Sequence, residues 1–262
     1  MPLKVRSDPP NRVETPAARS LHDLKVTLNG VEPSIWRRIS VPSDYTLEDL
    51  HDVLQLAMGW TNSHLHQFLT DGFRYCPPDP DDEIAVDTPT DDSATVRLYE
   101  VLRSPGARLV YEYDFGDSWE HDLEVEAIRP AAKGEDGPGC TRGERACPPE
   151  DCGGYGGYEN FLQAIQDPKN PEHEEMLTWC GGWFVAEAFD PRRVNKLLVT
   201  YAARRRAWLR GPVPRDTASG LYKEARIDLL ARILEARDRE SERQRRAALK
   251  WRVPMKARKR KP

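Results

Sequence analysis

Two short segments near the start of the chain alternate apolar and polar residues, and this pattern constrains the fold more than any other feature. It occurs at residues 24–28 (Leu-Lys-Val-Thr-Leu) and 35–41 (Ile-Trp-Arg-Arg-Ile-Ser-Val). Successive side chains of a strand point to opposite faces of a sheet, so both segments predict half-buried strands. The dipeptide Asn29-Gly30 between them is typical of a turn. We therefore expect a β-hairpin here.

Other strand-like segments follow, and most helix-like segments come after them. Residues 46–59 have apolar side chains at helical spacing; Thr46 and Asp49 resemble a capping box, and Gly59 suits the helix end. Further strands are predicted at residues 64–69, 108–113 and 119–128, and further helices at residues 95–102, 159–166, 171–179, 190–209 and 221–249. This order favours an α+β fold: a mostly antiparallel sheet with packed helices and a helical C-terminal extension.

Two segments show neither the strand periodicity nor the helix periodicity, and both are predicted to be loops. Residues 76–93 are rich in Asp and Pro, and residues 130–157 are rich in Gly, Pro and Cys. A structureless stretch as long as the second one is usually functional, held in place by other contacts, or disordered. Its glycine-rich end, residues 153–158, suits either a phosphate cradle at a helix start or a backbone that needs positive φ angles.

The net charge of −4 conceals a division of the chain into an acidic and a basic part. Residues 204–262 contain 20 Lys and Arg against 7 Asp and Glu, which leaves 19 against 36 for residues 1–203. We expect a disordered leader over residues 1–20, an α+β domain over 21–203, and a basic helical extension with a disordered tail over 204–262. The basic part suits contact with nucleic-acid phosphates. The alternatives are that it folds back onto the acidic body or only keeps the chain in solution.

Composition excludes several classes of protein. No apolar run approaches the roughly 20 residues of a membrane-spanning helix. Residues 1–20 hold four prolines and no apolar stretch, unlike a secretory signal. The five cysteines are an odd number, which disfavours a disulfide scaffold. We therefore expect a cytoplasmic protein with reduced thiols and no membrane contact.

Three histidines and one aspartate form the first candidate site, which we call the His/Asp set: His64, His66, His121 and Asp117. His64 and His66 lie two residues apart on one predicted strand, and His121 follows the turn that contains Asp117. If the two strands are neighbours, the imidazoles and the carboxylate could bind a divalent transition metal such as zinc. The alternative is a structural cluster in which the histidines bond to aspartates or to the main chain.

Three cysteines of the second loop form a weaker candidate for a structural zinc site. Cys140, Cys147 and Cys152 are spaced seven and five residues apart. The four residues between Cys147 and Cys152 are at the upper limit for a zinc knuckle. A metal there would hold the loop in place. The alternative is that these are ordinary small buried side chains.

Three segments taken together resemble a known family. They are GWTNSHLHQF at residues 59–68, YDFGDSWEH at residues 113–121 and GERACPPEDCGG at residues 143–154. In this order they resemble the plasmid pRiA4b open-reading-frame-three-like family, over about residues 21–198. The resemblance implies an α+β fold and a link to mobile elements, because some members are labelled resolvase-like passengers of transposons. It implies no catalytic residues.

The sequence leaves three functional hypotheses. The favoured one is a non-enzymatic binding or accessory protein linked to mobile elements, which contacts nucleic acid through residues 204–262. The alternative is a metal-dependent hydrolase at the His/Asp set, in which Asp114 or Glu120 acts as base on a metal-bound water. The third is a structural module whose cysteine loop binds zinc.

Overall fold

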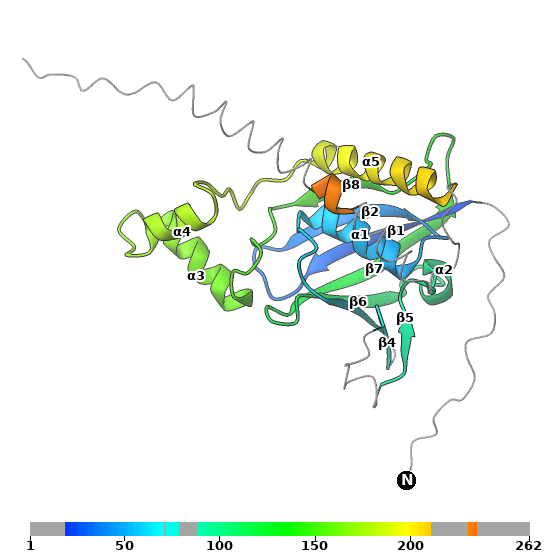
Figure 1. Ribbon diagram of the computed structural model, residues 1–262, viewed down its shortest axis with the longest axis horizontal. Coiled ribbons are helices and arrows are strands. Elements are labelled where there is room, and N and C mark those ends of the chain that lie inside the picture. The colour runs from blue at the N-terminus through cyan, green and yellow to red at the C-terminus, as the bar shows by residue number, and fades with distance from the viewer. Residues whose placement is uncertain (1–18, 71, 79–87, 211–229, 235–262) are drawn as a thin grey trace, which may run out of the picture.

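One eight-stranded sheet forms the body of the protein, in a computed structural model that describes residues 19–70, 72–78, 88–210 and 230–234 (Figure 1). The strand order is β5-β4-β3-β6-β7-β1-β2-β8, and all neighbours are antiparallel except β4 and β5. The strands are β1 (Ser20–Leu28), β2 (Ile35–Pro42), β3 (His66–Thr70), β4 (Phe73–Cys76), β5 (Thr90–Asp92), β6 (Arg108–Tyr113), β7 (Trp119–Pro130) and β8 (Gly139–Glu144). The helices are α1 (Leu47–Met58), α2 (Leu98–Val101), α3 (Gly154–Gln166), α4 (His173–Trp179) and α5 (Pro191–Leu209). The predicted α+β class with a mostly antiparallel sheet is confirmed.

The predicted hairpin lies between β7 and the edge strand β8 of this sheet. Strands β1 and β2 pair antiparallel with Leu24 opposite Ile39, and the other edge of β1 pairs with β7. The apolar residues that alternate along β1, such as Leu24 and Val26, are fully buried. Burial of such side chains stabilises a fold by about 1.5–3 kcal/mol each. The period-two pattern of the sequence therefore corresponds to one core-facing side of the sheet.

Helix α1 lies on the sheet and is buried over its whole length. The side chain of Thr46 accepts a hydrogen bond from the Asp49 amide, and the Asp49 side chain accepts one from the Thr46 amide, which confirms the capping box. Gly59 ends the helix in the left-handed conformation, at φ 102°. Because all twelve residues are buried, the polar side chains of α1 must find partners inside the protein.

Helix α5 covers β8 and α1, and it starts as the sequence predicts. Asp190 accepts a hydrogen bond from the Arg192 amide, with Pro191 at the first helical position. The Arg205 guanidinium bonds to both carboxylate oxygens of Asp49 on α1. Residues 230–234, drawn in orange beside α1, are helical and contribute three buried side chains to the core (Figure 1). These are Leu230, Ile233 and Leu234.

The remainder of the predicted extension lies outside the described residues, as do residues 1–18 of the predicted leader. The division of the chain at residues 20 and 203 stays a prediction. In the described part, no helix combines the length and apolar character needed to cross a membrane.

The two predicted loops contain regular structure that the sequence analysis missed, so both loop predictions are partly wrong. Strand β8 lies within residues 130–157 and pairs with β2, and α3 begins at residue 154 instead of 159. Cys76 ends β4, and β5 occupies residues 90–92. Both β5 and β8 are edge strands with polar sequences. They form because they pair with neighbouring strands, and they carry no apolar alternation that would predict them.

Candidate functional site

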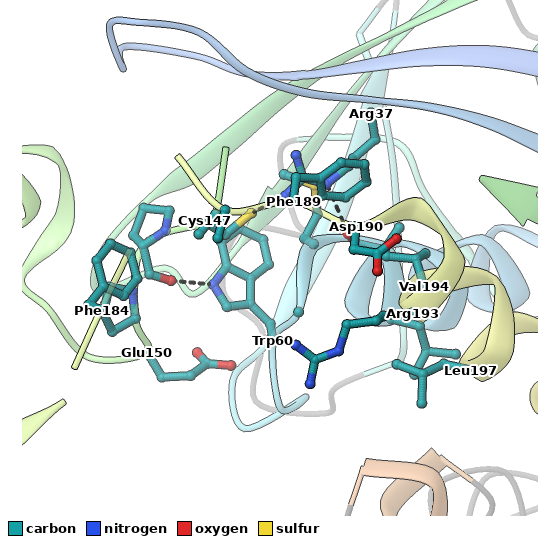
Figure 2. A pocket seen from close by; sticks show the side chains of 18 of the residues that line it. Arg37, Trp60, Cys147, Glu150, Phe184, Phe189, Asp190, Arg193, Val194 and Leu197 are labelled. Carbon is teal, nitrogen blue, oxygen red and sulfur yellow. Dashed lines mark hydrogen bonds between the residues drawn. The ribbon is translucent and has the colours of Figure 1, made fainter. Parts of the chain in front are cut away.

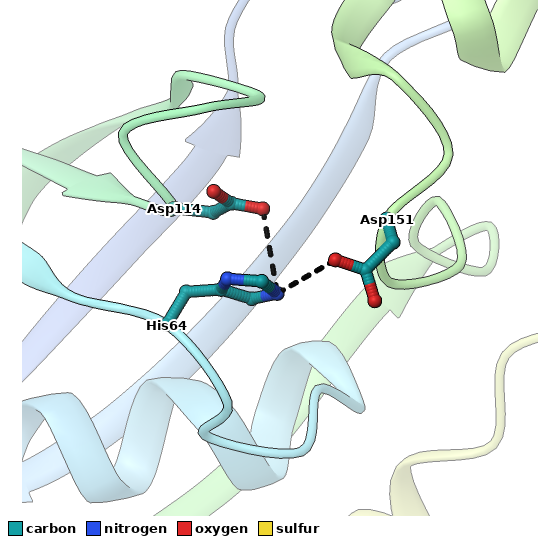
Figure 3. A group of neighbouring side chains, drawn as sticks. All are labelled: His64, Asp114 and Asp151. Atoms are coloured by element: carbon teal, nitrogen blue, oxygen red, sulfur yellow. Dashed lines mark ion pairs between the residues drawn. The ribbon is translucent and has the colours of Figure 1, made fainter.

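A cavity and a cluster of charged side chains adjoin each other at the C-terminal end of α1. The cavity has a volume of about 430 Å³ and lies between that helix end, residues 146–150, residues 180–190 and the start of α5 (Figure 2). The cluster consists of His64, Asp114 and Asp151 (Figure 3). Glu150 belongs to both places, because it lines the cavity and its Oε2 lies 3.8 Å from Nε2 of His64.

The two aspartates converge on one ring nitrogen of His64. Its Nε2 atom lies 3.0 Å from Oδ1 of Asp151 and 3.6 Å from Oδ2 of Asp114. In the described part of the chain, these three side chains are the one group of His, Cys, Asp and Glu whose ligand atoms all lie within 4.8 Å of one another. They come from the loop before β3, the turn between β6 and β7, and the loop after β8. We call them the His64 cluster.

Backbone conformation orients the two aspartates toward His64. Asp114 and Asp151 both have left-handed backbones, at φ 59° and 57°. Aspartate tolerates this conformation better than most residues, but such strain persists mainly where surrounding structure imposes it, often at functional sites. Oδ1 of Asp114 accepts the amide hydrogen of Gly116 at 3.0 Å, which leaves Oδ2 facing His64.

Glu150 is held at Oε1 by Thr61 and at both oxygens by the Tyr113 hydroxyl, which lies 3.2 Å from Oε1 and 3.3 Å from Oε2. Oε1 accepts the amide of Thr61 at 2.6 Å, the hydroxyl of Thr61 at 2.9 Å and the hydroxyl of Tyr113 at 3.2 Å. Burial, reinforced by the nearby Glu150 carboxylate, raises the pKa of Tyr113, so this phenol stays a donor. These contacts fix the carboxylate with Oε2 on the side of His64, 3.8 Å from its Nε2.

A close contact between two turns sets the position of Asp151. Oδ2 of Asp117 accepts the Gly153 amide at 3.2 Å. A Cβ atom added at Gly154 would lie 2.9 Å from the carbonyl oxygen of Asp117. Gly153 and Gly154 have φ angles of 89° and 66°, which confirms that the glycine-rich segment supplies positive φ angles. Asp117 is therefore not a member of the His64 cluster, but it helps to position Asp151.

The His/Asp set predicted from the sequence does not meet at one point. Nε2 of His66 lies 3.1 Å from Glu48 on α1, and the Asp117 carboxylate holds the 153–154 loop. His121 is fully buried with Nδ1 3.2 Å from the carbonyl of Tyr111, and burial lowers its pKa to about 4. Of the four residues, His64 alone enters the cluster.

The three cysteines of the weaker candidate do not form a group of potential ligands in the described part of the chain. Burial raises the pKa of the Cys140 and Cys147 thiols to about 11 and that of Cys152 to about 12. Without a metal these side chains are therefore neutral thiols, as ordinary buried cysteines are. Zinc binding by them stays a prediction.

Sequence reasoning missed Glu150 and Asp151, and it considered Asp114 only as a base. Glu150 and Asp151 stand between two cysteines in a segment that carries the family resemblance. An acidic pair inside a long loop that is otherwise rich in Gly, Pro and Cys was the available signal. The pair could be recognised as part of a site only with His64 opposite it, and His64 is nearly 90 residues away in the sequence.

The start of the basic segment contacts the protein body. Arg205 is buried and bonds to Asp49, and Arg206 donates to the main-chain carbonyl of Asp136 at 2.7 Å. Two of the first three arginines of the segment are thus engaged within the protein. Binding of nucleic acid by residues 204–262 and a link to mobile elements stay predictions.

Comparison with known proteins gives a consistent result. The family model described as plasmid pRiA4b ORF-3-like protein matches residues 20–196. The uncharacterized protein y4hQ of Sinorhizobium fredii is 42% identical over 183 residues, which cover 69% of this chain and 92% of that protein. The crystal structure of MM3350 from Methanosarcina mazei, a protein of unknown function, matches with a TM-score of 0.60 and 34% sequence identity. The match covers 67% of this chain and 97% of the MM3350 chain. Neither relative carries a named activity.

Proposed function

The chain belongs to the plasmid pRiA4b ORF-3-like family, and from that premise we propose that it binds a divalent first-row transition metal ion at His64, Asp114 and Asp151. One observation carries the proposal. Nε2 of His64 is shielded from solvent and makes no hydrogen bond with the described residues, although carboxylate oxygens of three residues lie 3.0–3.8 Å from it. A cation between the nitrogen and these oxygens would satisfy all of them.

The ligand types and their spacing fit such an ion. Neutral imidazole and carboxylate are ligands of zinc, manganese and ferrous iron. Metal–ligand bonds of about 2.0–2.2 Å place the ligands of a tetrahedral ion about 3.3–3.6 Å apart. The observed separations of 3.0 and 3.6 Å are close to that range. The side chain of Asp151 is 70% exposed, so it can adjust on binding.

Three protein ligands would leave a coordination position for water, which is the arrangement of hydrolytic metal sites. A bound metal lowers the pKa of such a water molecule toward neutrality. Glu150 is placed to accept the proton, because its Oε1 is held by Thr61 and Tyr113 and its Oε2 faces His64. This arrangement supports hydrolysis as the reaction class. The role of base then passes to Glu150 from Asp114, which is a ligand here, and from Glu120, which is exposed.

Metal analysis of the full-length protein, purified without chelators, tests the proposal. Wild-type protein is expected to hold about one equivalent of a transition metal, and His64→Ala or Asp151→Asn less than about 0.2 equivalents. His173→Ala is the matched control, because this histidine lies on α4 and its Nδ1 bonds to the Ala164 carbonyl. Circular dichroism confirms that each variant is folded.

Two results would overturn the proposal. One is wild-type protein that stays below about 0.2 equivalents after incubation with zinc, manganese and ferrous iron. The other is His64→Ala protein that keeps the metal. Either result would identify the cluster as a polar network between His64 and its neighbouring carboxylates.

A further inference from the structure

Helices α3 and α4 lie beside the sheet, away from α1 and α5 (Figure 1). We call residues 154–185 the α3–α4 arm. Its small core is a group of aromatic rings whose neighbouring centroids lie 5.2–6.4 Å apart: Tyr158, Phe161, Trp179 and Phe184. No residue of α4 is buried. The outer side of the arm is therefore open to a partner.

Three exposed apolar side chains lie at the end of the arm. Trp179, Trp183 and Val185 are 45%, 62% and 48% exposed. In the described part of the chain they are three of the eight exposed large apolar residues, and they lie within seven positions. Trp179 is fixed, because its ring packs edge-on against Phe161 with centroids 5.7 Å apart. Exposed aromatic surface of this kind is enriched at protein interfaces, so the patch suits docking.

Acidic side chains lie next to this patch on α4. Glu172, Glu175 and Trp179 are spaced by three and four residues, so they share one face of the helix, and Glu174 stands beside them. All three glutamates are exposed, and none forms an ion pair with another described residue. The whole arm contains five acidic residues and one lysine. A partner of this surface should therefore combine positive charge with apolar side chains.

One segment of this chain has that composition, although it lies outside the described residues. Residues 243–261 contain ten Lys and Arg and no Asp or Glu, and apolar residues stand among them: Leu249, Trp251, Val253 and Met255. The last described residue is Leu234, and 28 residues follow it. Extended, they span up to about 90 Å, several times the radius of about 16 Å of a 200-residue domain. The segment can therefore reach the arm of its own molecule.

The open side of the sheet is the other acidic surface, and it fits this segment less well. Strand β7 carries four acidic residues there: Glu120, Asp122, Glu124 and Glu126. Glu124 already pairs with Arg108, and Glu126 with Arg38, both at 2.8 Å. No large apolar residue of β7 is exposed. The arm alone offers unpaired acidic groups and an apolar surface together.

We propose that the α3–α4 arm binds residues 243–261 of its own chain. Cations of the segment pair with the glutamates of α4, and its apolar side chains cover Trp179 and Trp183. Arginine and lysine also interact favourably with the face of an indole ring. A nucleic acid that contacts the segment would compete with the arm for the same cations, so the arm would control whether they are available. The proposal does not depend on a metal at the His64 cluster.

Trypsin digestion of the full-length protein measures whether the segment is held. Trypsin cleaves after Lys and Arg, and its rate follows the fraction of molecules in which the segment is released. A variant with four substitutions on the arm is expected to lose residues 243–262 at least about fivefold faster than the wild type, because several exposed charge pairs are removed together. The substitutions are Glu172→Gln, Glu174→Gln, Glu175→Gln and Trp183→Ser. All four residues are exposed, and circular dichroism confirms that the variant is folded.

A matched control removes the same number of charges from the open side of the sheet. It carries Glu120→Gln, Asp122→Asn and Glu124→Gln on β7, and its cleavage rate is expected to equal that of the wild type. His64→Ala is also expected to be cleaved at the wild-type rate, which separates this proposal from the metal proposal.

Carbodiimide cross-linking, which joins a carboxylate to an amine in direct contact, locates the binding. In the monomeric full-length protein, Lys250 or Lys256 is expected to link to Glu174 or Glu175. These links should largely disappear at about 1 M salt, where charges on the surface are screened within about 3 Å.

Three results would overturn the inference. They are equal cleavage rates of the wild type and the arm variant, equally fast cleavage of the β7 control and the arm variant, and the absence of cross-links between the basic segment and α4 within one molecule.

Discussion

The imidazole rings of His51 and His66 stack face to face, with centroids 3.5 Å apart and planes inclined by 11°. The contact joins α1 to β3, and each of the two rings also has a polar partner. Nε2 of His66 lies 3.1 Å from Glu48, and Nε2 of His51 lies 2.6 Å from Oδ1 of Asn62. Asn62 has a left-handed backbone at φ 58° and precedes His64 by two residues. The segment that carries His64 is thus anchored to a buried polar network.

Replacing His51 by Phe tests that anchor. The substitution removes the hydrogen bonds to Asn62 and to the Tyr111 hydroxyl, so it should lower the free energy of unfolding by about 1–3 kcal/mol. It should also weaken metal binding, because the segment before His64 loses its support. Urea unfolding and metal titration measure the two effects. Gln67→Ala, on the partly exposed side of β3, is the control; an equal effect there would contradict the prediction.

Two glycines at the start of α3 provide a matched pair. Gly154→Ala should destabilise the protein by about 1–3 kcal/mol and lower its metal content, because its φ is 66° and its Cβ would meet the Asp117 carbonyl at 2.9 Å. Gly156→Ala meets nothing within 4 Å and should stabilise α3 by up to about 1 kcal/mol. Thermal unfolding and metal analysis distinguish the two variants. Similar behaviour of both would show that the close contact is unimportant.

The buried pair of Arg205 and Asp49 should show strong coupling. Arg205→Met leaves a buried carboxylate without its cation and should cost about 3–5 kcal/mol of unfolding free energy. Combining it with Asp49→Asn should cost less than the sum of the two single variants. A double-mutant cycle measures this difference. Arg204→Met, at an exposed position, serves as the control, and additivity of the pair would refute the coupling.

Acid should destabilise the protein through His121. Burial lowers the pKa of this side chain to about 4 in the folded state, against an ordinary value of 6.5 for histidine. Below about pH 6.5 the unfolded chain binds a proton that the folded protein does not, so stability falls by about 3 kcal/mol by pH 4. Burial lowers the pKa of His22 as well, which acts in the same direction. Urea unfolding between about pH 7 and pH 4 should show this loss. His121→Phe should show a smaller loss; parallel curves would argue against the assignment.

Elements with a local signal could be predicted from the sequence. The capping box at Thr46 and the Asp190-Pro191 start of α5 specify those two helices by contacts within a few residues. Strand β8 has no such signal, because its path is set by pairing with β2. The short edge strand β5 is acidic and pairs with β4 in parallel, which no local pattern encodes.

The candidate site could be predicted only in part. His64 was identified because imidazole is a common metal ligand, but its strand neighbour His66 lies against α1. Asp114 and Asp151 join His64 only after β3 and β6 have paired and the loop after β8 has docked. Such long-range convergence leaves no spacing in the sequence by which it could be recognised.

Arg37 holds the segment after β8 through the main-chain carbonyls of Glu144 and Arg145. A carbonyl is present whatever the side chain, so this support is independent of amino-acid identity at those positions. Residues along that wall of the cavity can therefore change in evolution or by engineering while the path of the chain is kept. Relatives that retain the arginine can share one scaffold and still differ in the side chains of that wall.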